Sequence, residues 1–207
     1  DTIKIPVFFH NLNYDKNVFF TSLIHYRGDK KMTILPENLE KFKAFQIGKL
    51  HFLDSMRFLN SSLSDLIKNV PSDTKNFLKH LTEDVNKIPL LTQKGQFPYE
   101  WFDDIEKFKL PISEIKREFF DNKLTLSELS DDDWNQVQNV IKEFNIQTFE
   151  EYHDYYLNID VNGLADVFEN FRETSLKYYK LEPCHYVGTP SYGWDAMLLE
   201  TRVELES

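Results

Sequence analysis

Apolar positions at the start of the chain change from strand spacing to helix spacing. Residues 3–10 form a β-branched and aromatic run that ends at Asn11 and Asn13, and this pattern predicts a buried strand. Over residues 15–26 the apolar side chains recur at helical spacing, and Asp15 is a candidate N-cap. The opening of the chain is therefore expected to be a strand, a short loop and a helix.

Two further strand patterns and two short helix patterns follow. Residues 32–35 and 44–52 predict strands that pair antiparallel with each other. Residues 63–70 predict an amphipathic helix with Ser62 as its N-cap, and residues 74–81 predict another helix. These elements indicate an α/β fold. In open α/β sheets, polar residues just beyond the carboxyl end of a strand are the usual place for a site.

The middle of the chain changes to a proline-containing loop and then to helix. Residues 86–112 carry three prolines and predict a long ordered loop, a type of segment that is often functional. From Ile112 the pattern becomes helical. Ser130 precedes three aspartates, which predicts a capped helix with an acidic first turn that ends at Phe144.

The last part of the chain predicts one long helix and one short one. Thr148 and Glu151 have the spacing of a capping box, and the helix that they start should run to about Tyr179. Pro183 ends this pattern, and residues 194–199 predict a last short helix. The carboxyl-terminal half is therefore expected to be helical.

Composition and charge narrow the class of protein. The chain has 207 residues, of which 24 are basic and 34 acidic, so a basic protein that coats nucleic acid is excluded. With Cys184 as the single cysteine, no disulfide framework is possible, which favours an intracellular location in cytoplasm, nucleus or mitochondrion. No apolar run is long enough to span a membrane, so no membrane partner is expected. The start at Asp1, directly before a strand, predicts a piece of a longer protein.

The first group of residues with chemical potential follows the first predicted strand. Asn11 and Asp15 lie four positions apart just beyond it. The aspartate can ligate a hard cation such as Mg²⁺, and the asparagine can orient a phosphate or a sugar. The alternative is that they form only a turn and an N-cap, which the spacing by itself favours.

A second group lies on the long predicted helix. Tyr156 and Asp160 stand at positions i and i+4, so they project from one helix face. A carboxylate there can hold a metal while the phenol aligns an attacking water; the alternative is a pair of surface neighbours. Lys94 in the proline-containing loop can neutralise a phosphate, or it is an exposed lysine without a role. Cys184 directly precedes His185, a poor geometry for a catalytic pair, so Cys184 is interpreted as structural.

Taken in order, these segments resemble the exonuclease region of protein-primed family-B DNA polymerases from phages, organellar plasmids and Polinton-type elements. The run FFHNLNYD (8–15) resembles the second exonuclease motif of that family, and YLNID (156–160) resembles the third. Between them, FLDSMRFLNSSLSDLIKNV (52–70) resembles the segment that supplies a serine beside the primer strand. LADVFENFR (164–172) and HYVGTPSYGWDAML (185–198) resemble the link towards the polymerase domain.

The resemblance implies a ribonuclease-H-like fold and 3′→5′ proofreading by two-metal phosphodiester hydrolysis with Mg²⁺ or Mn²⁺. Asp15 and Asp160 would be metal carboxylates, Tyr156 would orient the attacking water and Lys94 the phosphate. The primer terminus would be contacted by four polar or aromatic residues: His10, Asn11, Tyr14 and Ser55. The implied partners are a single-stranded DNA 3′ end and the remainder of the polymerase chain, with a terminal protein as a further candidate.

One motif of the family is missing. No Asp-x-Glu precedes Asn11, so the fold is expected to be incomplete at its amino terminus and the metal site to be short of carboxylates. Residues 1–180 are then expected to form the exonuclease-like domain, and residues 181–207 the start of the link to the polymerase domain. Two functions stay open: the proofreading region of a DNA polymerase, and a catalytically inactive polymerase-derived domain that binds DNA or protein.

Overall fold

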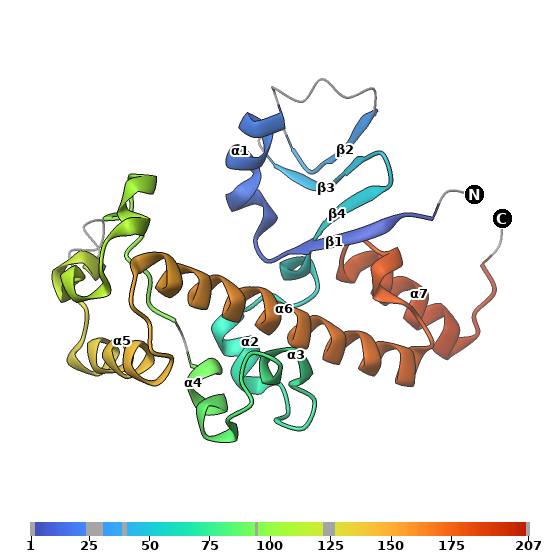
Figure 1. Cartoon of the computed structure of the whole chain (residues 1–207). Helices are drawn as coiled ribbons and strands as arrows, with labels where there is room; N and C mark the ends of the chain where they lie inside the picture. Colours follow the sequence, from blue (N-terminus) through green and yellow to red (C-terminus); the bar gives the residue numbers. More distant parts are fainter. Residues whose placement is uncertain (1–2, 24–30, 39–40, 94, 122–126, 206–207) are drawn as a thin grey trace. The chain divides into compact units, whose positions relative to one another are not determined.

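The computed structural model describes residues 3–23, 31–38, 41–93, 95–121 and 127–205. The chain divides into two compact units. Unit 1 consists of residues 1–62 and 168–207, and unit 2 consists of residues 63–167. Figure 1 gives the element labels that are used below.

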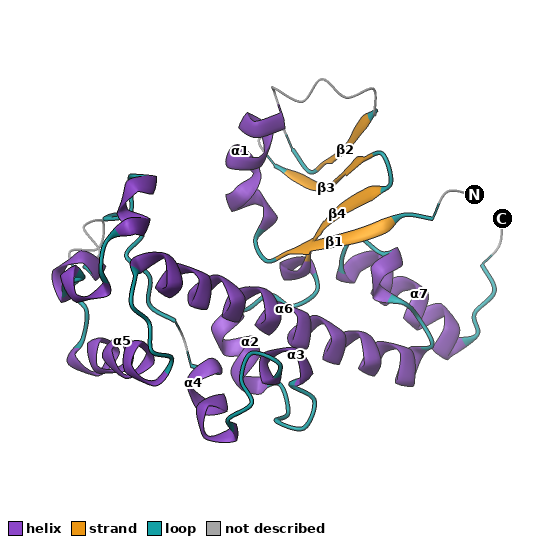
Figure 2. Ribbon diagram, in the orientation of Figure 1, coloured by secondary structure: helices purple, strands orange, loops and turns teal. Residues whose placement is uncertain are grey.

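Unit 1 is built on a mixed four-stranded sheet with the strand order β1-β4-β3-β2 (Figure 2). The strands are β1 (Ile5–Phe9), β2 (Met32–Pro36), β3 (Phe42–Ile47) and β4 (Leu50–Asp54). β1 runs parallel to β4, whereas β4 pairs antiparallel with β3 and β3 with β2. The α/β class and the antiparallel pairing of the second and third strands are confirmed.

Two expectations for these strands are wrong. Residues 44–52 form two strands rather than one, because the chain turns at Gly48, whose φ of 58° lies in the left-handed region that glycine adopts easily. The first strand is only half-buried, and Ile5 is 51% exposed. β1 has a neighbour on one side only among the described strands, so its apolar residues reflect an edge strand rather than a fully buried one.

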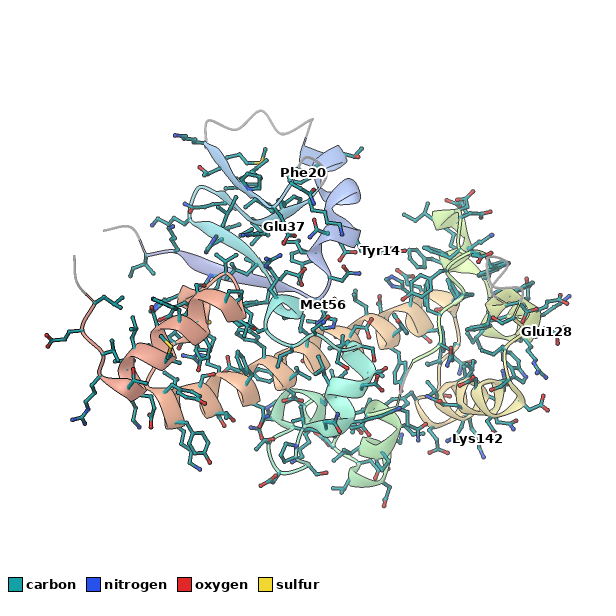
Figure 3. All side chains as sticks on the ribbon, turned by 180° about the vertical axis from the view of Figure 1, so that it is seen from behind. Tyr14, Phe20, Glu37, Met56, Glu128 and Lys142 are labelled. Carbon is teal, nitrogen blue, oxygen red and sulfur yellow. The ribbon has the colours of Figure 1, made fainter. Side chains whose placement is uncertain are left out.

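Helix α1 (Leu12–Leu23) packs on one face of this sheet. Its Leu12 and Phe20 contact a cluster of ring side chains from β3 and β4, in which Phe45 and Phe52 stack with centroids 4.3 Å apart. The Asn13 side chain also bonds both backbone groups of Phe42, at 3.2 and 3.3 Å. Figure 3 shows Phe20 on the side of α1 towards the strands and Tyr14 on the outer side.

Helical segments complete unit 1. They are η1 (Ser55–Arg57), the part of α6 (Phe149–Tyr179) from Phe168 onward, η6 (Pro183–His185) and α7 (Thr189–Thr201). The rings of Phe8 and Phe168 lie 3.8 Å apart, which joins β1 to this part of α6. α6 ends at Tyr179, and Lys180 directly after it has a φ of 58°. α7 is longer than the sequence predicts.

Unit 2 is helical in its described part. Its α-helices are α2 (Leu63–Asn69), α3 (Asn76–Lys79), α4 (Ile88–Leu91), α5 (Asp131–Glu143) and the part of α6 through Val167. Its 3₁₀ turns are η2 (Val85–Lys87), η3 (Ile105–Lys109), η4 (Ile112–Glu114) and η5 (Arg117–Phe120). Phe149 is fully buried in the core, where Trp101, Phe102 and other aromatic rings pack against it.

The predicted capping box at the start of α6 is confirmed, and Ser130 caps α5. The Ser130 hydroxyl accepts from the Asp133 amide at 3.1 Å. The Glu151 amide donates to the Thr148 hydroxyl at 3.3 Å, while the Glu151 carboxylate accepts from the Thr148 amide at 3.4 Å. Both caps connect residues three positions apart, so local sequence is enough to specify them.

Residues 86–120 differ from the prediction in two places. Residues 112–120 form two 3₁₀ turns instead of a continuous α-helix. The expected loop 86–112 contains α4 and two 3₁₀ turns. Pro89 lies in the first turn of α4, a position that needs no amide donor, so it starts a helix where it was expected to prevent one. Among the described residues, no helix is long and apolar enough to cross a membrane.

Candidate functional site

The polar residues that follow the first strand lie at one edge of the unit 1 sheet. β1 and β4 are parallel, and Phe9 pairs in register with Asp54. The carboxyl ends of both strands therefore meet, which brings residues 10–15 and 54–55 together. We call this group the strand-end half-site: His10, Asn11, Asp15, Asp54 and Ser55. Such an edge is where ligands bind in open α/β sheets.

Asp54 organises the strand-end half-site. Its side chain is buried and accepts from the backbone amides of Asn11 (2.9 Å), Leu12 (3.1 Å) and Met56 (3.0 Å). The carboxylate thereby satisfies amides at the starts of α1 and η1, which lack partners within their own helices. The expectation that Asp15 caps the first helix is wrong, because α1 begins three residues earlier and Asp54 satisfies its first amides.

Asn11 adopts a left-handed backbone conformation, with a φ of 72°. Asparagine and glycine are the residues that enter this region most readily. Its carbonyl accepts from the amide of Tyr14 at 2.8 Å, which closes the first turn of α1. The left-handed backbone thus explains in part why asparagine occupies position 11. The Asn11 side chain is exposed and available for a ligand.

Asp15 lies in the first turn of α1 and is half-buried. Its pKa is raised from the ordinary value, first by burial and then by the negative charge of Asp54. Two neighbouring carboxylates that raise a pKa by repulsion are relieved by a cation. Asp15 offers an oxygen ligand of the kind that a hard divalent ion prefers, whereas both oxygens of Asp54 already accept from backbone amides.

His10 and Ser55 form a connected network in the same half-site. His10 Nδ1 lies 2.9 Å from the Ser55 hydroxyl, and His10 Nε2 lies 2.9 Å from the carbonyl oxygen of Ser61. Ser55 is fully buried, and its hydroxyl donates to the Phe9 carbonyl at 2.9 Å. The Ser55 side chain therefore positions the strand ends. Tyr14, by contrast, is 77% exposed and presents a ring on which a base can stack.

Unit 2 contains a second group of polar residues, which we call the helix half-site: Tyr99, Tyr156 and Asp160. Tyr156 interacts with the Asp160 carboxylate, as the i, i+4 spacing on α6 predicts, and each side chain shifts the pKa of the other. It also lies 2.7 Å from the Tyr99 hydroxyl. Burial raises the pKa of Asp160 to about 6, against the opposing effect of the bond from Tyr156. The pKa of Tyr156 is raised by burial and by the Asp160 charge, so its phenol keeps its proton.

The loop between α4 and η3 packs against the Tyr156 ring. The rings of Phe97 and Tyr156 lie 5.1 Å apart, and the Tyr152 hydroxyl donates to the Gln96 carbonyl at 2.6 Å. A Cβ atom at Gly95 would lie 2.8 Å from two ring carbons of Tyr156, which is closer than real contacts allow. Glycine at this position therefore lets the loop backbone approach the ring. Lys94, the predicted phosphate ligand, lies outside the described residues.

The structure thus groups the predicted residues into two half-sites and adds two residues that the sequence did not indicate. Within the described part of the chain, no three His, Cys, Asp or Glu side chains are placed to hold one metal ion. Asp54 and Tyr99 were missed as members of a site. The acidic end of β4 was a local signal for Asp54, whereas Tyr99 becomes visible only through its contact with Tyr156.

Comparison of the chain with protein-family models, with curated proteins and with solved structures found no match.

Proposed function

We propose that this chain supplies the 3′→5′ proofreading exonuclease region of a protein-primed family-B DNA polymerase, with a ribonuclease-H-like fold. The observation that carries the proposal is the Tyr156 hydroxyl, which lies 2.7 Å from the Tyr99 hydroxyl and interacts with the Asp160 carboxylate one helix turn away. A phenol with fixed neighbours on a half-buried helix face can orient a water molecule towards a phosphate. The ordered resemblance of the sequence motifs supports the same assignment.

In the proposed reaction, water attacks the terminal phosphodiester phosphorus and the 3′ oxygen of the preceding nucleotide leaves. Mg²⁺ or Mn²⁺, when bound, would activate the water and stabilise the leaving oxygen. Asp15 and Asp160 would hold the metal, and the Tyr156 hydroxyl would align the water. Lys94 would face the phosphate charge.

The substrate in this proposal is the single-stranded 3′ end of a primer. The exposed Tyr14 ring can stack on a terminal base, a contact of about 1–3 kcal/mol in proteins that bind single strands. The exposed Asn11 side chain can bond the sugar or the base. His10 and Ser55 would act by holding these residues in place, because their polar atoms already bond each other and nearby carbonyls.

The chain carries fewer carboxylates than a two-metal site uses, since no Asp-x-Glu precedes Asn11. We therefore expect the 207-residue chain to bind Mg²⁺ and Mn²⁺ weakly and to hydrolyse DNA slowly. This shortage also favours the second candidate function, a polymerase-derived domain that binds DNA or protein without cleaving it. Asp54 also favours the non-catalytic function, because its two oxygens already accept hydrogen bonds from three backbone amides and are therefore not free to bind a metal ion.

End-labelled single-stranded DNA distinguishes the two functions. Two proteins are each incubated with this DNA and Mn²⁺. One is the 207-residue chain, and the other is the same chain extended at its amino terminus by a strand that carries Asp-x-Glu. The proofreading proposal predicts faster shortening from the 3′ end on extension, and loss of that gain in Asp160→Asn. Binding of the same DNA without a gain in cleavage would instead identify the non-catalytic domain.

A further inference from the structure

Unit 2 contains a cavity of about 350 Å³ that belongs to neither half-site. Its lining includes Leu91, Phe144, Asn145, Glu151, Tyr155 and Asn158. Cavities of this size, with apolar walls and a few polar groups, are typical of small-molecule sites.

The cavity lies on a different face of α6 from the helix half-site. Glu151, Tyr155 and Asn158 stand at positions i, i+4 and i+7, which share one helix face. At about 100° per residue, Tyr156 and Asp160 point roughly 140–180° away from that face. A ligand in this cavity would consequently not contact the Tyr156–Asp160 pair.

The walls of the cavity favour a flat, apolar ring. Leu91 is fully buried at its base, and the rings of Phe144 and Tyr155 pack together with centroids 4.8 Å apart. The Tyr155 hydroxyl donates to the Leu90 carbonyl at 3.5 Å, so it is turned towards that backbone. Aromatic walls of this kind bind planar rings by offset or edge contacts.

Two side-chain amides at the rim determine the polar requirements of the ligand. Gln147 Nε2 donates to Asn145 Oδ1 at 3.0 Å, which leaves the Asn145 amide donor without a protein partner in the described chain. Asn158 Nδ2 donates to the Asp154 carbonyl at 2.8 Å, which leaves Asn158 Oδ1 as an acceptor without one there. The ligand should therefore present both an acceptor and a donor.

The negative charge of Glu151 in the cavity lining disfavours an anionic ligand. Among the described residues that line the cavity, Glu151 is the single charged side chain. Its carboxylate accepts from the amides of Gln147 and Thr148. A phosphate group in the cavity would meet this charge without a lysine or arginine in the lining to offset it.

We propose that the cavity binds a neutral nucleobase, either in a free nucleoside or as an unpaired base of a single strand. A nucleobase combines a flat ring with neighbouring donors and acceptors on its edge. This assignment does not rest on the proposed exonuclease function, because the cavity and the helix half-site lie on different faces of α6.

The test is a titration of the full chain with thymidine, deoxyguanosine, thymidine 5′-monophosphate and a short oligothymidylate, followed by ¹H–¹⁵N NMR. The proposal predicts saturable shifts of the Asn145 and Asn158 side-chain amides, and weaker binding of the monophosphate than of thymidine. Tighter binding of the oligonucleotide than of the nucleoside would identify a strand as the source of the base. The reverse order would identify a free nucleoside.

Asn145→Asp is the critical variant. Aspartate tolerates the positive φ of 52° at this position and keeps an acceptor for Gln147, but it removes the amide donor. We expect about tenfold weaker nucleoside binding, the loss that about 1.4 kcal/mol produces. Asn135→Asp on α5 makes the same charge change outside the lining residues and should bind as the parent does.

Three results would overturn the proposal. They are the absence of saturable shifts with either nucleoside, equal affinities of the parent and Asn145→Asp, and equal binding of benzene, which has the ring but no polar edge. An unchanged backbone amide spectrum of Asn145→Asp, apart from residues near the substitution, shows that the variant is folded. If that spectrum is lost, Asn158→Leu takes its place, because leucine suits a helix interior and removes the acceptor.

Discussion

The Tyr99 hydroxyl lies 2.7 Å from the Tyr156 hydroxyl, although the two residues are 57 positions apart in the chain. Tyr156 in turn interacts with Asp160, so the phenol links a loop residue to a half-buried carboxylate. This arrangement accounts for both the packing and the electrostatics of the helix half-site. It also makes the pKa of Asp160 an experimental reporter of the site.

Tyr156→Phe should raise the pKa of Asp160 above its value of about 6, because the phenol bond stabilises the charged carboxylate. Carboxyl carbon chemical shifts followed across a pH series give this pKa directly. Tyr99→Phe keeps the bond from Tyr156 and should change the pKa of Asp160 less. An unchanged or lower Asp160 pKa in Tyr156→Phe would show that the bond is absent in solution.

Asp160 should reduce stability at neutral pH. Its folded pKa of about 6 exceeds the unfolded value near 3.8, so the folded state binds the proton more tightly. Stability is therefore highest below about pH 4 with respect to this group and falls as the pH rises towards and past 6. The loss is at most on the order of 2–3 kcal/mol.

Asp160→Asn should therefore raise the free energy of unfolding at pH 7.5 and change it little at pH 4. Urea denaturation at both pH values measures the difference. Equal stability of Asp160→Asn and the parent at pH 7.5 would mean that burial does not penalise the charge.

Gly95→Ala should destabilise the chain by about 1–3 kcal/mol, because the added methyl group overlaps the Tyr156 ring. Gly193→Ala is a matched control, since a Cβ atom there meets no atom within 4 Å. In the middle of α7, alanine should instead add about 0.5–1 kcal/mol. Thermal unfolding of both variants tests the contrast, and similar effects of the two changes would refute the close approach at Gly95.

Asp54→Ala should cost about 1–3 kcal/mol, because it leaves the buried amides of the first turn of α1 without an acceptor. Removal of its charge should also lower the pKa of Asp15. Asp84→Ala removes an exposed acceptor at η2 and should cost less. An Asp15 pKa that is unchanged in Asp54→Ala would assign the whole shift to burial.

Asn11→Gly separates the backbone role of Asn11 from a role in binding. Glycine keeps the left-handed conformation, so the free energy of unfolding should change little, whereas Asn11→Ala should lose about 1 kcal/mol. If the side chain contacts DNA, Asn11→Gly should weaken binding of single-stranded DNA although the fold is intact. Undiminished DNA binding by this variant would leave Asn11 with its backbone role alone.

The features that the sequence predicts well are those specified by neighbouring residues. The caps at Ser130 and Thr148 and the Tyr156–Asp160 pair connect positions three or four apart, and all of them are present. Local hydrophobic periodicity also predicts the opening strand and helix and the long helix α6, but it misses the division of residues 44–52 into β3 and β4 and the helix α4.

The features that it misses depend on residues that are distant in the chain. Asp54 satisfies the amide of Asn11 across 43 positions, and this contact moves the start of α1 away from Asp15. Tyr99 reaches Tyr156 only because Gly95 lets the loop backbone approach the helix. Hydrophobic periodicity and capping rules carry no information on such pairings.

We propose that Asp15 and Asp160 bind the same divalent ion, and paramagnetic NMR with substoichiometric Mn²⁺ measures whether they do. We expect Mn²⁺ to broaden the amide signals around both residues, and Asp160→Asn to reduce the broadening around Asp15. Broadening at Asp15 that is unchanged in Asp160→Asn, or no broadening at either residue, would contradict it.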